Sequence, residues 1–349
     1  MDFFGLDIGS RTIKLVQLKK IGDQFQLLAF GSAPSTLKGL ASDSESDLNK
    51  LAEIIKKLHQ EAKITTKNVA TALPEDQVFT RVITLPKLSE EELTDALKWE
   101  AEQYVPISLD EVTLAHQIIG ETKENMKGKI QVLLVAAPNR LVDKLVKVLK
   151  IAGLNPLSIE TEVLAMSRSL ASPDAEAFLV IDLGARATDI SILEKGQVIF
   201  TRSIPTAGEA LTRAIASGLG LEISRAEEYK KAYGVDPKKL EGKVGEAIRP
   251  VLEVVIKEID HAIQFYREMT NKRSENEAQE KARTISRVLL TGGTAILPEV
   301  VTFFAKRLAI ETQIGNPFSR AIKDSLLDKI PKSDLPFYAV AAGLAMKEV

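Results

Sequence analysis

Apolar and polar residues alternate in two stretches that lie half a chain apart. The first, GLDIGSRTIKLVQLKK, spans residues 5–20, and the second, VIDLGARATDISILEK, spans residues 180–195. In each stretch an apolar run leads into a short polar turn, and an alternating pattern follows the turn. Because this alternation is typical of half-buried strands, each stretch is predicted to fold as strand, tight turn and strand.

The two stretches also share the residues of their turns. At a constant offset of 182 − 7 = 175 residues, the aligned pairs are Asp7 with Asp182, Gly9 with Gly184 and Arg11 with Arg186. One interpretation is a pair of ordinary β-hairpins with glycine at each turn. That interpretation does not explain why an acidic residue closes both first strands. The other interpretation is an internal repeat, in which two half-domains face a shared cleft.

A different order of patterns occupies residues 79–157. VFTRVITLP reads as a strand, SEEELTDALKWEAEQYVP as a helix, DEVTLAHQII and KIQVLLVAAP as strands, and NRLVDKLVKVLKIAGL as a helix before a strand at 157–159. Ser89 with Glu92 is a capping box, and Asn139 is placed to cap the second helix. The pattern predicts a unit with the layout β-α-β-β-α-β.

Several other segments have a simpler structural interpretation. Apolar residues recur at helical spacing from Leu252 to Tyr266, Phe265 included, and predict the buried stripe of one long helix. The polar run at 271–283 and residues 34–48 are expected to be exposed loops. Trp99, the single tryptophan, is expected to be either half-buried or in contact with a partner.

Composition narrows the class of protein. The chain has 349 residues, a net charge of −2, no cysteine and three scattered histidines. Nothing in this balance favours binding to nucleic acid, and neither disulfide nor thiol chemistry is available. The amino terminus lacks the pattern of a signal peptide, and no apolar run reaches about 18 residues. A cytoplasmic protein is therefore expected.

The repeated turns suggest phosphate chemistry. Backbone N–H groups of tight turns can bind phosphate oxygens, and a carboxylate beside them suits a hydrated Mg²⁺. Neither turn is a Walker loop or a GxGxxG sequence, so those two phosphate cradles are absent. A third glycine-rich segment, LTGGTAILP at 290–298, follows a predicted strand, where Gly-Gly lets the backbone approach a flat ring.

Taken in this order, the three segments resemble the phosphate-1, phosphate-2 and adenosine motifs of the actin-like ATPases. The resemblance implies a two-lobed α/β fold of the ribonuclease H-like kind, with ATP or ADP and Mg²⁺ in the cleft. It implies that Asp7 and Asp182 hold the metal through waters. It also implies a set of nucleotide-binding residues: Asp7, Gly9, Ser10, Arg11, Thr12 and Lys14, then Asp182, Gly184, Arg186 and Thr188, then Gly292, Gly293, Thr294 and Leu297.

The second half is similar to the FtsA-like branch of that superfamily. AEEYKKAYG at 226–234 resembles the AExxKxxYG sequence of the branch, in which the Glu and Lys approach ribose and base. Here these are Glu227 and Lys230, which share a helix face, so a surface ion pair is the other interpretation. Further residues that the resemblance assigns to the nucleotide are Gly208, Glu209 and Thr212.

Two segments resemble the PilM family of type IV pilus assembly proteins. They are AGLNPLSIETEVLAMSRSL at 152–170 and IGNPFSRA at 314–321. The resemblance implies a scaffold that binds the N-terminal cytoplasmic segment of PilN in a groove between the inserted subdomain and the first half. It also implies contacts with the assembly ATPase and the platform protein, self-association, and a location at the membrane through partners.

Family position makes Glu160 or Glu162 the candidate that orients the attacking water. Arg186 and Ala187 stand where more efficient family members have a glycine-rich turn, and Asp189 stands where the repeat would place a lysine. The second turn is therefore expected to support slow hydrolysis at most. ATP would then act as a conformational ligand.

Two other functions remain open from the sequence. An FtsA-like filament protein would carry an amphipathic membrane helix at its C-terminus, whereas FYAVAAGLAM, residues 337–346, is expected to pack on the core. A small-molecule kinase on the same fold would need a substrate pocket with a positioned base, and no such set of residues is evident.

The expected domains are as follows: a first part of lobe 1 at 1–78, the inserted subdomain at 79–157, a return helix at 158–175, lobe 2 at 176–330 with a helical subdomain at about 205–285, and a C-terminal helix at 331–349.

Overall fold

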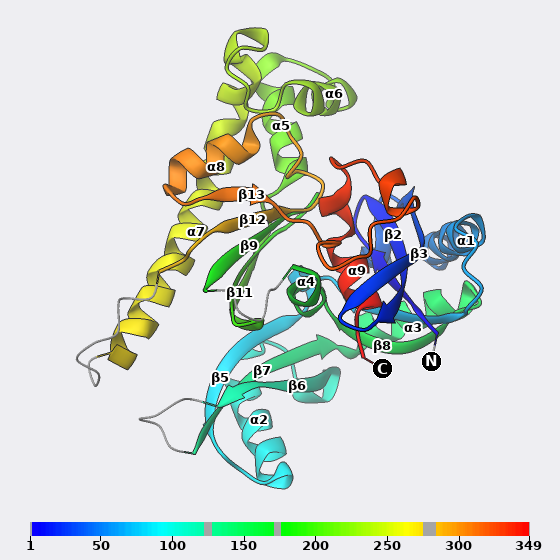
Figure 1. Ribbon diagram of the computed structural model, residues 1–349, viewed down its shortest axis with the longest axis vertical. Coiled ribbons are helices and arrows are strands. Elements are labelled where there is room, and N and C mark those ends of the chain that lie inside the picture. The colour runs from blue at the N-terminus through cyan, green and yellow to red at the C-terminus, as the bar shows by residue number, and fades with distance from the viewer. Residues whose placement is uncertain (1, 122–127, 171–175, 275–283, 349) are drawn as a thin grey trace.

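The computed structural model describes residues 2–121, 128–170, 176–274 and 284–348. They form two five-stranded sheets and one three-stranded sheet, with helices around them (Figure 1). Short 3-10 helices occupy Gly39–Ala41, Glu75–Gln77, Leu109–Glu111, Leu240–Gly242, Leu327–Lys329 and Leu335–Tyr338.

The first sheet has the strand order β3-β2-β1-β4-β8. β1 and β2 form the first predicted hairpin, and β4 and β8 run parallel to β1 and β4 respectively. The strands are β1 (Phe4–Ile8), β2 (Thr12–Ile21), β3 (Gln24–Pro34), β4 (Asn68–Leu73) and β8 (Asn155–Thr161). The helices of this lobe are α1 (Glu45–Glu61), α3 (Asn139–Ile151), α4 (Glu162–Leu170) and α9 (Ala339–Ala345).

The second sheet repeats this arrangement, with the order β11-β10-β9-β12-β13. β9 and β10 form the second predicted hairpin, and β12 runs parallel to β9 as β4 does to β1. The strands are β9 (Phe178–Leu183), β10 (Thr188–Glu194), β11 (Gln197–Ile204), β12 (Val288–Thr291) and β13 (Thr312–Ile314). Its helices are α5 (Gly208–Leu219), α6 (Ile223–Tyr233), α7 (Lys243–Ser274) and α8 (Val300–Leu308). The internal repeat is thus a repeat of sheet topology, and the predicted two-lobed actin-like fold is confirmed.

The third sheet has the order β5-β7-β6 and is covered on one face by α2. Its elements are β5 (Phe79–Pro86), α2 (Glu90–Tyr104), β6 (Val112–Glu121) and β7 (Lys129–Pro138). The capping box of Ser89 and Glu92 is present. The last two elements of the predicted six-element unit lie elsewhere: β8 pairs with β4 in the first sheet, and α3 packs against α1. The domain boundaries themselves stay a prediction.

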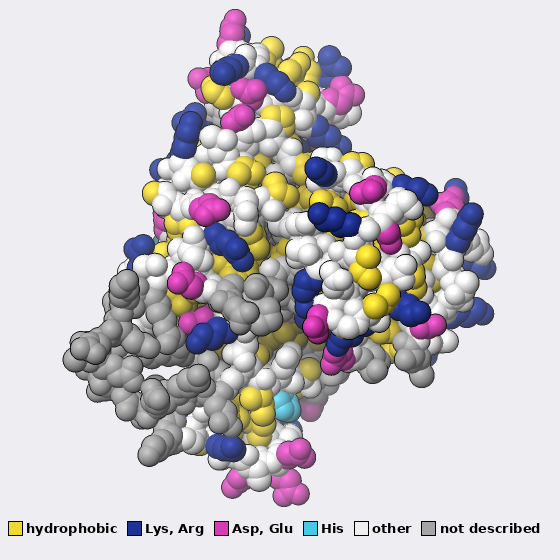
Figure 2. All heavy atoms as spheres, in the orientation of Figure 1, with side chains coloured by type: hydrophobic (Ala, Val, Ile, Leu, Met, Phe, Trp, Pro, Cys, Tyr) yellow, Lys and Arg dark blue, Asp and Glu magenta, His cyan; other side chains and the backbone are white. Residues whose placement is uncertain are grey.

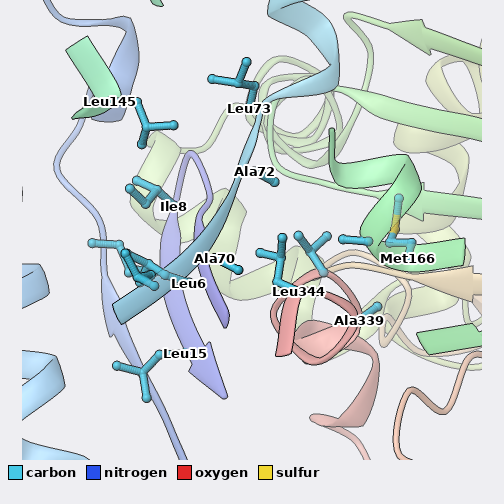
Figure 3. Close-up of a cluster of buried hydrophobic side chains, with 14 of the residues drawn as sticks. Leu6, Ile8, Leu15, Ala70, Ala72, Leu73, Leu145, Met166, Ala339 and Leu344 are labelled. Carbon is cyan, nitrogen blue, oxygen red and sulfur yellow. The ribbon is translucent and has the colours of Figure 1, made fainter. Parts of the chain in front are cut away.

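The C-terminal helix α9 lies inside the first lobe. Leu344 and Ala339 join Leu6, Ala70 and Met166 in one buried cluster (Figure 3). At Gly343 a Cβ atom would lie 1.8 Å from the carbonyl oxygen of Ala165 in α4, so only glycine permits this close approach. The expectation that residues 337–346 pack on the core is confirmed.

Four smaller expectations need correction. Asn139 does not cap α3, because it is the first helical residue and its side chain contacts Thr113 and Asp110. Phe265 is 47% exposed, while Tyr266 beside it is buried. The segment at 34–48 contains a 3-10 helix and the start of α1. In the run at 271–283, α7 extends to Ser274, and residues 275–283 lie outside the described residues.

The surface carries an exposed tryptophan and charged side chains of both signs. Trp99 on α2 is 63% exposed, so the half-buried alternative is wrong. On the face in Figure 2, acidic and basic side chains are interspersed. Within the described ranges, no helix combines the length and apolar character needed to cross a membrane.

Candidate functional site

The two predicted hairpin turns line one cleft between the lobes. Its volume is about 140 Å³. The cleft brings together many of the residues predicted to bind nucleotide or to act on it: Asp7, Gly9, Ser10, Arg11, Thr12, Lys14, Glu162, Asp182, Gly184, Arg186, Gly292 and Gly293. Small-molecule sites span roughly 300–1,000 Å³, so the cleft in this arrangement of the lobes is narrow.

The turn glycines have equivalent geometry in the two lobes. A Cβ atom on Gly9 would lie 2.7 Å from the carbonyl oxygen of Thr12, and one on Gly184 would lie 2.7 Å from that of Ala187. Real Cβ atoms do not approach oxygen so closely, so any other residue would open the turn. This explains why both repeats carry glycine two residues after the aspartate.

Lys14 is the cation at the base of the first turn. Its Nζ donates to Asp7 Oδ2 over 2.8 Å across the hairpin, where the two residues are paired. Burial alone would lower the pKa of Lys14, but the charges of Asp7, Asp182 and Glu162 outweigh it and raise that pKa. Lys14 therefore stays protonated among carboxylates from both lobes.

The second turn contains carboxylates without a matching lysine. Burial raises the pKa of Asp182, although Lys14 and the hydroxyl of Thr291, 3.0 Å away, oppose this. Burial, with the charges of Asp182 and Glu75, raises the pKa of Asp189 well above its usual value. Asp189 lines the cleft at the position that aligns with Lys14. The two turns are thus electrostatically unequal.

Glu162 lies between the two turns, at the start of α4. Its Oε2 accepts a hydrogen bond from the backbone N–H of Glu75 over 3.1 Å. Burial and the charges of Asp7, Asp189 and Asp182 raise its pKa well above the usual value. A carboxyl group of this kind can hold or accept a proton of a water molecule in the cleft.

The other candidate, Glu160, does not line the cleft. It pairs with Arg168, and its Oε2 accepts a hydrogen bond from Lys347 Nζ over 2.9 Å. Arg168 also donates to the carbonyl of Gly343 in α9 over 3.0 Å. The two candidates therefore have different environments: Glu160 at the end of β8 pairs with Arg168 and Lys347, and Glu162 faces the cleft.

Two contacts join the first lobe to the second lobe across the cleft, one from the first turn and one from the segment after β3. Arg11 Nε donates to Glu209 Oε1 over 3.2 Å, and Arg186 donates to the carbonyl of Leu37 over 2.7 Å. Lys38 and Leu40 line the cleft beside this contact. The segment at 34–48, predicted only as an exposed loop, is thus a wall of the site.

Glu227 and Lys230 form a partly buried network instead of a surface ion pair. Lys230 is 6% exposed, and its Nζ donates to Gly208 O, Thr212 Oγ1 and Glu227 Oε2 over 2.7–2.9 Å. Burial would raise the pKa of Glu227, but hydrogen bonds from Lys230 and Thr212 lower it to about 2. The network fixes α6 to the N-terminus of α5 and does not line the cleft.

The glycine pair after β12 approaches the second turn closely. Gly292 has φ of 80°, and a Cβ there would lie 2.3 Å from Asp182 Oδ1. Thr294 Oγ1 donates to the carbonyl of Gly184 over 3.0 Å. Phe337, which sequence reasoning missed, lines the cleft next to Gly293.

Two further predicted residues lie outside the cleft. Thr188 is buried, and its hydroxyl donates to the carbonyl of Thr206 over 2.7 Å. Leu297 is part of the hydrophobic core of the second lobe.

The donor set suits a hydrated cation. Asp7, Asp182 and Glu162 supply only oxygen ligands, which Mg²⁺ favours. Burial, with the charge of Asp7, raises the pKa of both Asp182 and Glu162. In the part of the chain that the structure describes, no group of three or more acidic or histidine side chains is placed to bind a metal directly. A hydrated Mg²⁺ held partly by phosphates fits these residues better than a direct protein cage.

Comparisons with known proteins give the same fold and a family. Among curated proteins, cell division protein FtsA of Enterococcus hirae is 22% identical over 94% of this chain and 81% of its own length. FtsA of Pseudomonas aeruginosa is 25% identical, with coverage of 98% and 88%.

Solved structures extend the comparison. A chain from a "PilM-PilN type IV pilus biogenesis complex" is 28% identical, with a TM-score of 0.81 and coverage of 99% of this chain and 98% of that one. MreB 5 of Spiroplasma citri, bound to AMPPNP, shares the fold at 15% identity and a TM-score of 0.52, with coverage of 98% and 94%.

The sequence profile of one family matches nearly the whole chain. That family is described as type IV pilus assembly protein PilM, and the match spans residues 5–349. The chain therefore belongs to the PilM family of type IV pilus assembly proteins.

Proposed function

We propose that the chain is an ATP-binding scaffold of the type IV pilus assembly machinery, located at the inner face of the cytoplasmic membrane through its partners. The observation that carries this proposal is the similarity, over 99% of the chain, to a protein solved as a PilM–PilN complex. The proposed partner is the N-terminal cytoplasmic segment of PilN, bound between the third sheet (β5-β7-β6), which belongs to the inserted subdomain, and the first lobe. The assembly ATPase and the platform protein are further proposed partners.

The cleft would hold the phosphates of ATP or ADP between its two turns. Lys14 would place its charge at the phosphates, and the turn N–H groups would donate to their oxygens. Asp7 and Asp182 would hold Mg²⁺ through waters, and the bound ion would neutralise phosphate charge. Glu162 would orient a water, since it is the candidate carboxylate that lines the cleft.

Hydrolysis would be slow because the second turn is poorly equipped for it. Asp189 places a buried acidic group where the first turn has Lys14, and Arg186 is engaged by the carbonyl of Leu37. Arg186 would have to release the carbonyl of Leu37 before it could contact a phosphate held at this turn. ATP would therefore mainly select a closed or open arrangement of the lobes.

Calorimetric titration tests the two parts separately. A synthetic N-terminal PilN peptide is expected to bind the purified chain, and ATP with Mg²⁺ is expected to bind whether or not the peptide is present. Absence of peptide binding both with and without ATP would contradict the partner. Absence of ATP binding alone would contradict only the cleft assignment.

An FtsA-like filament protein is the second candidate, because FtsA proteins are 22–25% identical to most of this chain. Such a protein would polymerise with ATP on a lipid surface. Sedimentation with ATP and vesicles separates the candidates, since filaments that form on vesicles without PilN would favour this alternative.

A further inference from the structure

Glu75 is a buried carboxyl group that lies beside the cleft without lining it. Its chain neighbours Pro74, Asp76 and Gln77 line the cleft, whereas Glu75 does not. Only 4% of Glu75 is exposed. A carboxyl group buried to this degree costs free energy unless neighbouring polar groups stabilise it. The contacts that Glu75 makes therefore show what this residue does.

On the side of the first lobe, Glu75 is attached to the start of α4. Its backbone N–H donates to Glu162 Oε2 over 3.1 Å. Burial raises the pKa of its carboxyl group to about 7, and this rise is opposed by the hydroxyl of Thr80, the backbone N–H of Val163 and the hydroxyl of Thr161. Val163 directly follows Glu162 in α4. A movement of Glu75 would therefore move the donor that holds the side chain of Glu162.

On the side of the second lobe, Glu75 meets β11. The hydroxyl of Thr201 lies 3.5 Å from Glu75 Oε1. β11 packs against both the 3-10 helix Glu75–Gln77 and β5, and Figure 1 shows β11 beside β5. At the start of β11, Gln197 meets the inserted sheet, because a Cβ on Gly120 of β6 would lie 3.0 Å from its Oε1. A hydrogen bond of 3.5 Å is long, so a small movement between the lobes would strengthen or break it.

We propose that Glu75 is a positioning residue, which transmits the arrangement of the two lobes from Thr201 to Glu162. The inference rests on the proposed function, since Glu162 orients a water only when ATP occupies the cleft. In the arrangement seen here, Thr201 holds the carboxyl group of Glu75, and the backbone N–H of Glu75 holds Glu162.

Separation of the lobes has a direct consequence in this arrangement. β11 leaves the 3-10 helix, Glu75 loses the hydroxyl of Thr201, and the donor to Glu162 is no longer fixed. A displacement of about 1 Å in a catalytic group can slow a reaction roughly a hundredfold. Hydrolysis is thus confined to the closed arrangement of the lobes, while ATP can bind in either arrangement.

Substitutions at both ends of the connection test the proposal. Thr201→Val removes the hydroxyl in the second lobe and keeps the side-chain shape. Glu75→Ala removes the carboxyl group, and Glu75→Gln replaces it with a neutral group that still forms hydrogen bonds. The matched control is Thr84→Val, an exposed threonine on β5. Thermal unfolding checks that each variant is folded.

Single-turnover hydrolysis and calorimetric ATP titration separate positioning from binding. Thr201→Val and Glu75→Ala are expected to slow hydrolysis by about tenfold to a hundredfold. The Kd for ATP is expected to stay within about twofold of the parent value, because the lost interaction acts only on the reacting groups. Glu75→Gln and Thr84→Val are expected to hydrolyse ATP as the parent does. In a Glu162→Gln background, Thr201→Val is expected to have no further effect.

Amide hydrogen exchange measures the positioning itself and does not depend on hydrolysis. The Glu75 amide is expected to exchange at least about tenfold faster in Thr201→Val than in the parent or in Thr84→Val, while the amides of β1 stay protected. The proposal is overturned if the exchange of this amide is unchanged, or if Thr201→Val slows hydrolysis equally in the Glu162→Gln background. Absence of ATP binding overturns the proposed function and this inference together, whereas ATP binding with unchanged exchange overturns only this inference.

Discussion

Asp7 and Lys14 determine the charge balance of the first turn. Their 2.8 Å contact is made across a hairpin, and Lys14 also responds to Asp182 and Glu162. If Asp7 holds Mg²⁺ through water, Asp7→Asn removes the ion's ligand while it keeps the side-chain volume. The expected result is loss of the Mg²⁺-dependent part of ATP affinity, at least tenfold, or about 1.4 kcal/mol.

The measurement is an ATP titration in Mg²⁺ and in EDTA. Asp95→Asn, an exposed acidic residue on α2, is the control and should behave as the parent. An Asp7→Asn protein that keeps the full difference between Mg²⁺ and EDTA would show that Asp7 does not hold the ion.

Glu75 makes stability depend on pH. Burial raises its pKa from 4.5 to about 7. Between pH 4.5 and about pH 7, Glu75 binds more protons in the folded chain than in the unfolded chain. Its contribution to the free energy of unfolding is therefore fully present below about pH 4.5 and is lost as the pH rises toward 7. The shift corresponds to roughly 3 kcal/mol. Asp189, Glu162 and Asp182 act in the same direction.

Urea unfolding at pH 5 and pH 8 tests this residue. Glu75→Gln is expected to flatten the fall in the free energy of unfolding by about 1–3 kcal/mol, because glutamine cannot ionise. Glu102→Gln, exposed on α2, should leave the fall unchanged. Parallel pH curves for Glu75→Gln and the parent would contradict the assignment.

The sequence predicted the site best where the same residue types recur in both halves of the chain. The Asp and Gly of each turn were found because they recur at one offset, and the structure places them in one cleft. Glu160 and Leu297 were assigned by family position, and burial beside Arg168 or in the core decides their environment instead. Phe337 was missed because its role depends on how α9 folds back, which no local pattern encodes.

At the scale of elements, α9 packs closely against its neighbours because glycine leaves no side chain at two of the contact points. A Cβ on Gly343 would lie 1.8 Å from Ala165 O, and one on Gly5 would lie 2.1 Å from Ala341 O. Gly343→Ala is therefore expected to separate α9 from α4 and to lower the free energy of unfolding by about 3 kcal/mol or more.

Thermal and urea unfolding check this prediction. Gly218→Ala in α5 is the matched control: its Cβ would meet only the methyl group of Ala247 at 3.2 Å, and a helical alanine is favourable. The control is expected to change stability by no more than about 1 kcal/mol. Equal effects of the two substitutions would contradict the close packing of α9.

Secondary structure was more predictable than the partners of each element. Periodicity located the strands and helices of 79–157. It could not show that β8 joins the first sheet, because parallel pairing connects strands that lie far apart in the sequence. Similarly, the helical stripe of α7 predicted Tyr266 as buried but not that Phe265 faces outward and meets Phe200 at 5.2 Å.

At the scale of the whole molecule, an ion pair between Arg11 and Glu209 joins the two lobes across the narrow cleft. The Arg11–Glu209 pair is partly exposed and worth up to about 1 kcal/mol. Glu209→Gln is therefore expected to speed nucleotide association by roughly two- to fivefold. Stopped-flow mixing with a fluorescent ATP analogue measures this rate. The exposed Glu222→Gln is the control, and a slower rate in Glu209→Gln would show that Glu209 helps to bind nucleotide.

The central claim is that partners bring this nucleotide-binding scaffold to the membrane. Flotation with liposomes tests it directly, with full-length PilN, PilN lacking its N-terminal segment, or no protein in the bilayer. The chain is expected to float only with full-length PilN, with ATP and Mg²⁺ changing the amount bound. Flotation with empty liposomes, or equal flotation with truncated PilN, would contradict the account.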